Sequence, residues 1–132
     1  MSTETDVKTR TITLTDRPPV TIVESEWPIL AKADYDDDRS QDGQPNRNAY
    51  GHLIVRQHAD GRAIVYARYD YDTRWQHERN ETRRAGVLLP PGATADDIIR
   101  AIKRVHGMIG IESQDWQMLA QECIADLPPE RI

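Results

Sequence analysis

Residues 50–71 read YGHLIVRQHADGRAIVYARYDY, and this stretch decides the fold class. Two runs rich in β-branched and aromatic residues flank Asp60-Gly61, a dipeptide typical of tight hairpin turns because both residues tolerate left-handed backbone angles. We therefore predict a central β-hairpin formed by residues 50–58 and 62–71. The chain shows no parallel βαβ pattern of the kind that houses dinucleotides.

The length of the hairpin loop decides which residues share a face of the sheet. A loop of two or four residues would place Leu53 and Val55 opposite Arg68 and Tyr66, and we expect this aliphatic face to lie under helices. A three-residue loop would shift the register by one. With the even-numbered loop, the other face would carry a set of aromatic, histidine and arginine side chains: Tyr50, His52, Arg56, His58, Tyr69 and Tyr71.

Shorter strand patterns lie before and after the central hairpin. Residues 8–15 and 20–24 alternate apolar and polar side chains around Pro18-Pro19, which predicts an N-terminal hairpin. Residues 27–35 form a third strand pattern, in which Pro28 indicates an edge or a bulge. A short apolar run at residues 87–89 would add one more strand.

Two helix patterns follow the strands. Thr94 is a good N-cap, and Asp96 and Asp97 place carboxylates in the first turn, where they favour the helix dipole. Ser113 caps a second helix, which Pro128-Pro129 ends. Strands first and helices last predict an α+β domain: an antiparallel sheet of about four to six strands, with two C-terminal antiparallel helices packed on one face.

Length and loop composition indicate a single domain. The chain has 132 residues, and chains usually divide only well above about 200 residues. We expect one α+β domain over residues 8–132. Residues 1–7 are polar and are expected to be disordered. Residues 36–48 (DDDRSQDGQPNRN) are acidic and lack periodicity, which predicts a mobile loop.

Composition excludes several classes of protein. A single cysteine excludes an internal disulfide and a cysteine-built metal site. No run approaches about 18 consecutive apolar residues, and the N-terminus lacks the apolar core of a signal peptide, so we expect a cytoplasmic protein with no membrane contact. The net charge of −5 disfavours a dedicated duplex binder. The charge is uneven, however, because all 7 basic residues of the segment 50–91 are arginines between two acidic flanks.

Motifs that carry chemistry are largely absent. The chain contains no GxSxG, HExxH or GxxxxGK[ST] motif. Asp38 to Gly43 resembles the opening of a calcium loop, but Ala49 stands where a bidentate glutamate is needed. Cys123 falls on the apolar stripe of the second helix, where we expect a core residue. We therefore expect no enzymatic activity, no bound metal and no cofactor.

An arginine-rich segment follows the central hairpin and extends its outer face. Aromatic residues and arginine are enriched at binding hot spots, so the first hypothesis is a protein-interaction domain. The alternative is a nucleic-acid-binding module, in which tyrosines stack on bases and arginines contact phosphates. Cross-strand tyrosine pairs on a solvated sheet are the ordinary explanation. The candidate partner-binding residues are Tyr50, His52, Arg56, His58, Tyr69, Tyr71, Arg74, Trp75, Arg79, Arg83 and Arg84.

Two stretches carry a resemblance to known proteins. TITLTDRPPVTIVESEWPILAKA (residues 11–33) and RQHADGRAIVYARYDYDTRW (residues 56–75) resemble small bacterial proteins associated with phages and plasmids, for which no activity is established. The resemblance implies a bacterial cytoplasmic accessory protein of mobile-element origin. The protein partner of the first hypothesis is not identified by the sequence. A homodimer formed through an edge strand or the exposed face stays open.

Overall fold

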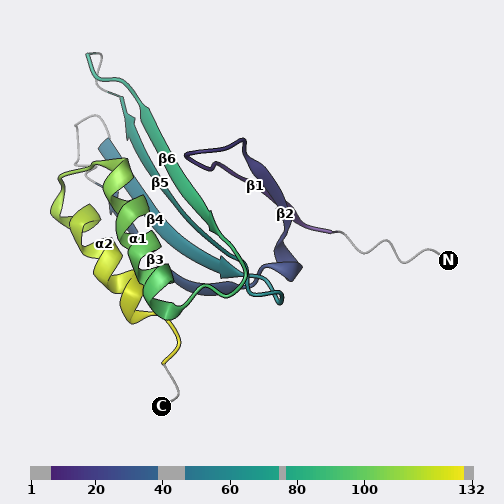
Figure 1. Cartoon of the computed structure of the whole chain (residues 1–132). Coiled ribbons are helices and arrows are strands. Elements are labelled where there is room, and N and C mark those ends of the chain that lie inside the picture. Colours follow the sequence, from purple (N-terminus) through teal and green to yellow (C-terminus); the bar gives the residue numbers. More distant parts are fainter. Residues whose placement is uncertain (1–6, 39–46, 75–76, 130–132) are drawn as a thin grey trace.

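The computed structural model describes residues 7–38, 47–74 and 77–129, which form two antiparallel sheets and two helices (Figure 1). The smaller sheet is a ribbon of β1 (Thr9–Ile12) and β2 (Val20–Val23), followed by a 3₁₀ turn at Glu24–Glu26. The larger sheet has the order β3-β4-β5-β6, with the strands β3 (Ile29–Asp38), β4 (Arg47–Gln57), β5 (Ala63–Thr73) and β6 (Glu81–Leu89). The predicted α+β class is confirmed, with both predicted hairpins present.

The helices α1 (Ala95–Ile109) and α2 (Gln114–Ala125) pack on the same face of the larger sheet, α1 against β5 and β6 and α2 against β3 and β4. Figure 1 shows both helices on one side of this sheet and the ribbon on the other. The predicted caps are present: the Thr94 hydroxyl accepts from Asp97 N–H (3.1 Å), and the Ser113 hydroxyl accepts from Trp116 N–H (3.3 Å). Each cap satisfies a backbone donor at a helix start that has no partner within the helix.

The main core lies between the helices and the sheet. Trp116 is fully buried and stacks on His106 with 5.2 Å between the ring centres. Its indole N–H donates to the His106 carbonyl (3.3 Å), so these two residues join α1 to α2. Cys123 is buried in this core, as predicted. The buried aliphatic residues of the same cluster include Leu53, Val55, Val65, Ile98, Ile102, Val105, Ile109 and Leu119.

The register of the central hairpin differs from the predicted one by one residue. Val55 pairs with Val65 rather than with Tyr66. The His58 N–H donates to the Arg62 carbonyl (2.9 Å), which leaves three residues in the loop instead of two or four. Gly61 takes the left-handed conformation in this loop, with φ of +94°. Because side chains alternate between faces, an odd loop length moves every residue of β5 to the face opposite the predicted one.

Two further segments form longer strands than their composition indicated. Asp36, Asp37 and Asn48, which fall within the predicted mobile loop, belong to β3 and β4, and residues 39–46 lie outside the described residues. β6 begins at Glu81 instead of residue 87, so that half of the arginine-rich segment lies in the sheet. Residues 81–86 carry charged side chains on both faces. Their sequence therefore lacks the alternation of apolar and polar residues that predicts a strand.

The ribbon packs on the face of the sheet that the helices leave free. A second buried cluster joins Ile12, Leu14 and Ile22 of the N-terminal segment to Ile64 and Tyr66 of β5. This cluster covers only one end of that face. Its sheet residues are Ile54, Ile64, Tyr66 and Leu88, so it lies at the end of the face near the central hairpin loop.

The segment between β1 and β2 passes directly over Gly86 of β6. The Thr15 N–H donates to the Gly86 carbonyl (2.9 Å), and the Gly86 N–H donates to the Thr15 hydroxyl (3.2 Å). A Cβ at position 86 would lie 2.4 Å from the Thr13 carbonyl oxygen. Glycine is therefore required at this crossing.

Among the described residues, no helix has the length and apolar character needed to cross a membrane.

Candidate binding surface

Three of the candidate residues lie on the helix-covered face of the sheet, and two of them, Tyr69 and Arg83, contact a helix. Tyr69 is only 9% exposed and makes an edge contact with Trp116 at 6.3 Å between ring centres. The Tyr71 hydroxyl donates to the Glu78 carboxylate. Arg83 donates to the Ile109 carbonyl (2.8 Å) at the end of α1, where a cation complements the helix dipole. These roles follow from the one-residue shift in register.

Arg56 joins the ribbon to the sheet from a buried position. It is 6% exposed, and its Nε donates to the Tyr66 hydroxyl (2.9 Å). Its Nη1 donates to the Trp27 carbonyl (3.0 Å). His58 lies at the hairpin turn, where its ring is 5.0 Å from that of Trp27. Both residues are therefore parts of the scaffold.

The other candidates divide between the free face and the far ends of the strands. Tyr50, His52 and Arg84 lie on the face opposite the helices. Arg74 and Arg79 are exposed near the connection between β5 and β6, away from the other three. Trp75 lies outside the described residues. The structure thus does not bring the ten described candidates together into one patch.

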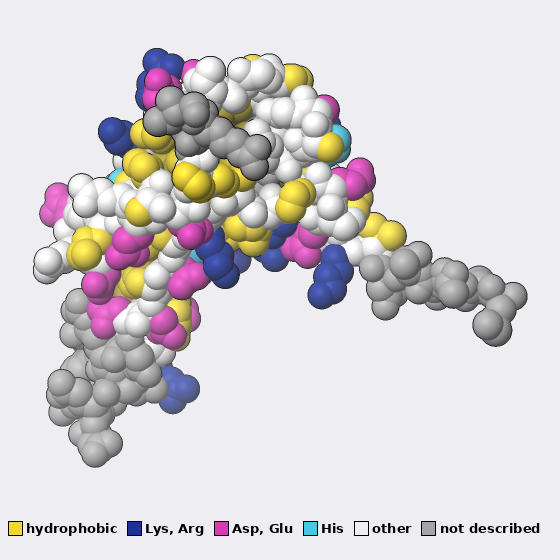
Figure 2. Space-filling model, turned by 90° about the horizontal axis from the view of Figure 1, so that it is seen from below, with side chains coloured by type: hydrophobic (Ala, Val, Ile, Leu, Met, Phe, Trp, Pro, Cys, Tyr) yellow, Lys and Arg dark blue, Asp and Glu magenta, His cyan; other side chains and the backbone are white. Residues whose placement is uncertain are grey.

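A hollow opens where the ribbon meets the free face of the sheet. We call it the basic hollow; its volume is about 210 Å³. Figure 2 shows the molecule as an arch with Lys and Arg side chains along its concave side. The charged, histidine and tyrosine residues that line the basic hollow are Arg10, His52, Tyr66, Arg68 and Arg84.

Two of the three arginines of the basic hollow are paired with carboxylates. Arg10 Nε lies 2.7 Å from Glu24 Oε1, and Arg68 Nε lies 2.7 Å from Asp70 Oδ2. The hydrogen bond from Arg10 lowers the pKa of Glu24. Burial raises the pKa of Asp70, but hydrogen bonds from Thr82 and Arg68 outweigh it, and the net direction is down. Both carboxylates are therefore ionised at neutral pH.

Arg84 differs from these two arginines because it is exposed and, within the described part of the chain, has no hydrogen bond or ion pair. It sits directly across the β5–β6 ladder from Arg68. The Asp70 carboxylate bonds to Arg68, and the charge of Arg84 also lowers its pKa, so that one carboxylate faces two arginines and a net positive charge remains at the basic hollow. The exposed guanidinium of Arg84 presents its donors to any acidic group that enters.

His52 lies beside these arginines in its neutral form. Burial lowers its pKa, and the positive charge of Arg68 lowers it further. A neutral imidazole has one donor and one acceptor nitrogen, so His52 can form hydrogen bonds to a ligand without adding a positive charge of its own. An anion bound next to His52 would raise its pKa again, because opposite charges favour the charged form.

The sequence prediction missed three residues of the basic hollow. Tyr66 and Arg68 were expected on the face under the helices, and only the odd loop length places them outside. Arg10 comes from β1, far from β5 in the sequence. Arg10 is in phase with Ile12 and Leu14, with threonines between them, but no sequence signal identifies the sheet face on which β1 packs. A known odd loop length would have placed Tyr66 and Arg68 on the free face, but the sequence does not decide the loop length.

Metal-ligating side chains and the single cysteine are the remaining groups that could carry chemistry. Within residues 7–38, 47–74 and 77–129, no group of three or more His, Cys, Asp or Glu side chains is placed to hold a metal ion. Burial raises the pKa of Cys123 to about 12, so its thiol is not a ready nucleophile.

No protein-family model, curated protein or solved structure matches the chain. The resemblance to phage- and plasmid-associated bacterial proteins therefore stays a prediction from the sequence.

Proposed function

We propose that this protein is a non-enzymatic protein-interaction domain that binds an acidic side chain of a partner protein in the basic hollow. The observation that carries the proposal is the position of Arg84. Its guanidinium is exposed, makes no hydrogen bond or ion pair among the described residues, and shares the charge of Asp70 with Arg68. It lies at a concavity formed by two separate layers of the fold. Arg68 and Arg10 add to the local positive potential.

The size of the basic hollow supports a side chain as the ligand. Its volume of about 210 Å³ is below the roughly 300–1,000 Å³ typical of small-molecule sites. A glutamate or aspartate side chain is small enough to enter it and carries the two oxygens that an arginine fork recognises. A rim charge of this kind contributes to the rate and specificity of association with an acidic partner.

The nucleic-acid alternative receives less support from the geometry. Base stacking requires aromatic rings with an exposed face, but Tyr69 is packed against Trp116 and Tyr71 is held on the helix-covered face by Glu78. Trp75, the third ring of that hypothesis, lies outside the described residues.

The proposal is tested with a fluorescently labelled oligoglutamate peptide as the probe. We expect Arg84→Ala to weaken its binding about tenfold, since a charge-assisted hydrogen bond contributes roughly 1.5–3 kcal/mol. Fluorescence anisotropy at low and physiological salt measures the affinity. The matched control is Arg79→Ala, because Arg79 is exposed but does not line the basic hollow.

Two results would contradict the proposal. Equal weakening by Arg84→Ala and Arg79→Ala would mean that the peptide senses only the overall charge. Tighter binding of a mixed-sequence oligonucleotide than of the peptide would favour the nucleic-acid alternative. The cytoplasmic location, the bacterial mobile-element origin and a homodimer stay predictions from the sequence.

A further inference from the structure

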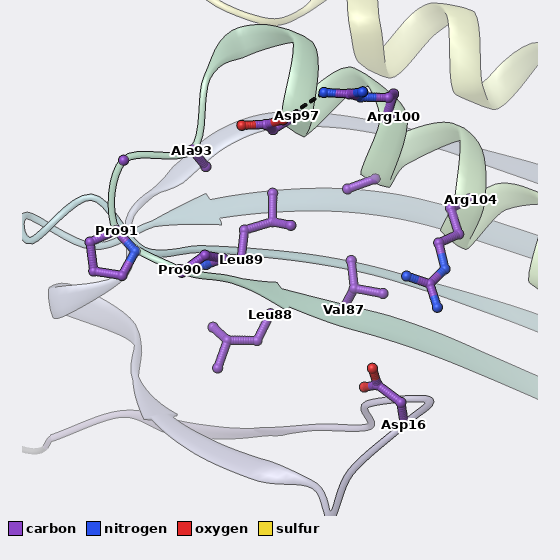
Figure 3. Close-up of a pocket in the computed structure, with 12 residues that line it drawn as sticks. Asp16, Val87, Leu88, Leu89, Pro90, Pro91, Ala93, Asp97, Arg100 and Arg104 are labelled. Atoms are coloured by element: carbon purple, nitrogen blue, oxygen red, sulfur yellow. Dashed lines mark hydrogen bonds and ion pairs between the residues drawn. The ribbon is translucent and has the colours of Figure 1, made fainter.

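A second concavity runs along the outer edge of β6, apart from the basic hollow. We call it the edge groove; its volume is about 410 Å³. Figure 3 shows it between α1 on one side and the segment that carries Asp16 on the other, with β6 along its floor. The Thr13–Thr15 crossing over Gly86 lies between the edge groove and the basic hollow.

The backbone of β6 is open toward the edge groove at Leu88. In an antiparallel ladder, successive residues point their N–H and C=O groups alternately toward and away from the neighbouring strand. Both groups of Gly86 bond to Thr15 and hence point away from β5. Leu88, two residues further, therefore also points its N–H and C=O outward. Among the described residues, no hydrogen bond reaches these two groups.

The chain's own pairing with this edge stops one step before Leu88. Thr15 pairs with Gly86, and Asp16 then leads into Arg17-Pro18-Pro19. Prolines cannot donate to a ladder, so the segment cannot continue along β6. The edge is thus covered at Gly86 and available at Leu88. An open donor–acceptor pair on an edge strand is a template for an added strand.

The side chains around Leu88 define the chemistry of such a strand. Val87 and Leu89 point toward α1 in Figure 3 and form an apolar floor, and Ala101 of α1 also lines the edge groove. Arg104 reaches from α1 toward this floor. It is exposed and has no ion pair within the described part of the chain, whereas its neighbour Arg100 is paired with Asp97 at 2.7 Å.

We propose that the edge groove binds an extended segment of a partner protein by strand addition to β6. The segment's backbone bonds to the N–H and C=O of Leu88, an apolar side chain packs on Val87 and Leu89, and an acidic side chain reaches Arg104. The unpaired charge of Arg104 selects this occupant over a purely apolar segment. The site is separate from the basic hollow, so it does not depend on the function proposed there.

The probe is the peptide Val-Ser-Glu-Ser-Val-Ser-Glu, since residues two apart lie on the same face of a strand, and Val87, Leu89 and Arg104 all lie on the α1 side of the edge groove. Binding is followed by fluorescence anisotropy and by hydrogen exchange of the Leu88 amide. We expect the peptide to slow this exchange at least tenfold. Arg104→Ala should weaken binding at least fivefold, whereas Lys103→Ala, the exposed neighbour outside the edge groove, should change it less than twofold.

N-methylated forms of the same peptide distinguish strand addition from charge attraction. Methylation of the amides that face β6 should abolish binding, and methylation of the alternate amides should preserve it. Equal binding of both forms would overturn the proposal, as would no binding at about 1 mM peptide. Loss of binding in Arg84→Ala with none in Arg104→Ala would also overturn it, because the peptide would then occupy the basic hollow.

Discussion

Arg56 shows how a single buried charge fixes the arrangement of the two sheets. Its guanidinium bonds to the Tyr66 hydroxyl in β5 and to the Trp27 carbonyl beyond the ribbon, and lies 3.8 Å from the Glu24 carboxylate. All these partners surround it in a position that is 6% exposed. Removal of a buried, hydrogen-bonded charge leaves its partners buried without hydrogen bonds. The loss in the free energy of unfolding then exceeds the net stabilisation that the intact interaction provides.

We therefore expect Arg56→Ala to lower the free energy of unfolding by about 2–4 kcal/mol. Urea denaturation measures this change. The exposed pair of Arg100 with Asp97 supplies the control, because Arg100→Ala should cost less than about 0.5 kcal/mol. A loss below about 0.5 kcal/mol in Arg56→Ala as well would show that the ribbon does not depend on this contact.

His52 gives the free energy of unfolding a defined dependence on pH. Burial and the charge of Arg68 lower its pKa in the folded protein, so the unfolded chain binds its proton more readily. The contribution of His52 is fully present above its unfolded pKa, near 6.5, and is lost as the pH falls below that value.

We expect His52→Asn to flatten this dependence between about pH 7.5 and pH 5.5. Urea denaturation of the wild type and the variant at both pH values measures the difference. The account of His52 fails if the two proteins lose the same free energy of unfolding over this interval.

An oligoglutamate peptide in the basic hollow should raise the pKa of His52, so the wild type should bind it more tightly at the lower pH.

At the scale of elements, Gly86 and Gly107 differ in the space that a side chain would find at each position. A Cβ at Gly86 would meet the Thr13 carbonyl oxygen at 2.4 Å, whereas a Cβ at Gly107, within α1, would meet nothing within 4 Å. The first glycine permits the ribbon to cross β6. The second only lowers the helical propensity of α1.

Gly86→Ala is therefore expected to destabilise the protein by at least about 2 kcal/mol, because the backbone of the crossing segment has to move. Gly107→Ala should stabilise it by about 0.5–1 kcal/mol. Thermal or urea unfolding of the pair is the measurement. A change of the free energy of unfolding in the same direction for both substitutions would contradict the close approach of the crossing segment to Gly86.

The order and type of the elements could be predicted from local patterns, but the register could not. Alternation around Asp60-Gly61, the caps at Thr94 and Ser113 and the helical apolar stripes are all short-range signals. The loop of the central hairpin depends on a single backbone bond from His58 to the Arg62 carbonyl. Two-, three- and four-residue loops all accommodate Asp-Gly, so the sequence does not decide between them.

This one ambiguity accounts for most of what was missed at the candidate site. With the correct parity, Tyr69 lies under α2 and Arg68 lies on the free face. The predictions of Tyr50, His52 and Arg84 on the free face agree with the structure, whereas whether these residues bind a partner stays untested. Arg10 reaches the basic hollow through tertiary packing of the ribbon, which leaves no mark on the local sequence.

At the scale of the whole molecule, the fold separates its two faces by role. The helices cover one face of the larger sheet, and the main core lies between them and this face. The ribbon covers only one end of the opposite face. The partial cover creates a concavity at each side of the Thr13–Thr15 crossing, one basic and one along a strand edge. The central claim is that the basic hollow is a site for acidic groups.

The most direct test of this claim is a map of amide chemical-shift changes during titration with an oligoglutamate peptide. The account predicts saturable changes at residues of the basic hollow, His52, Arg68 and Arg84, which are lost in Arg84→Ala and retained in Arg79→Ala. Changes confined to Arg74 and Arg79, or spread evenly over the exposed arginines, would contradict it, because the basic hollow would then have no role in recognition.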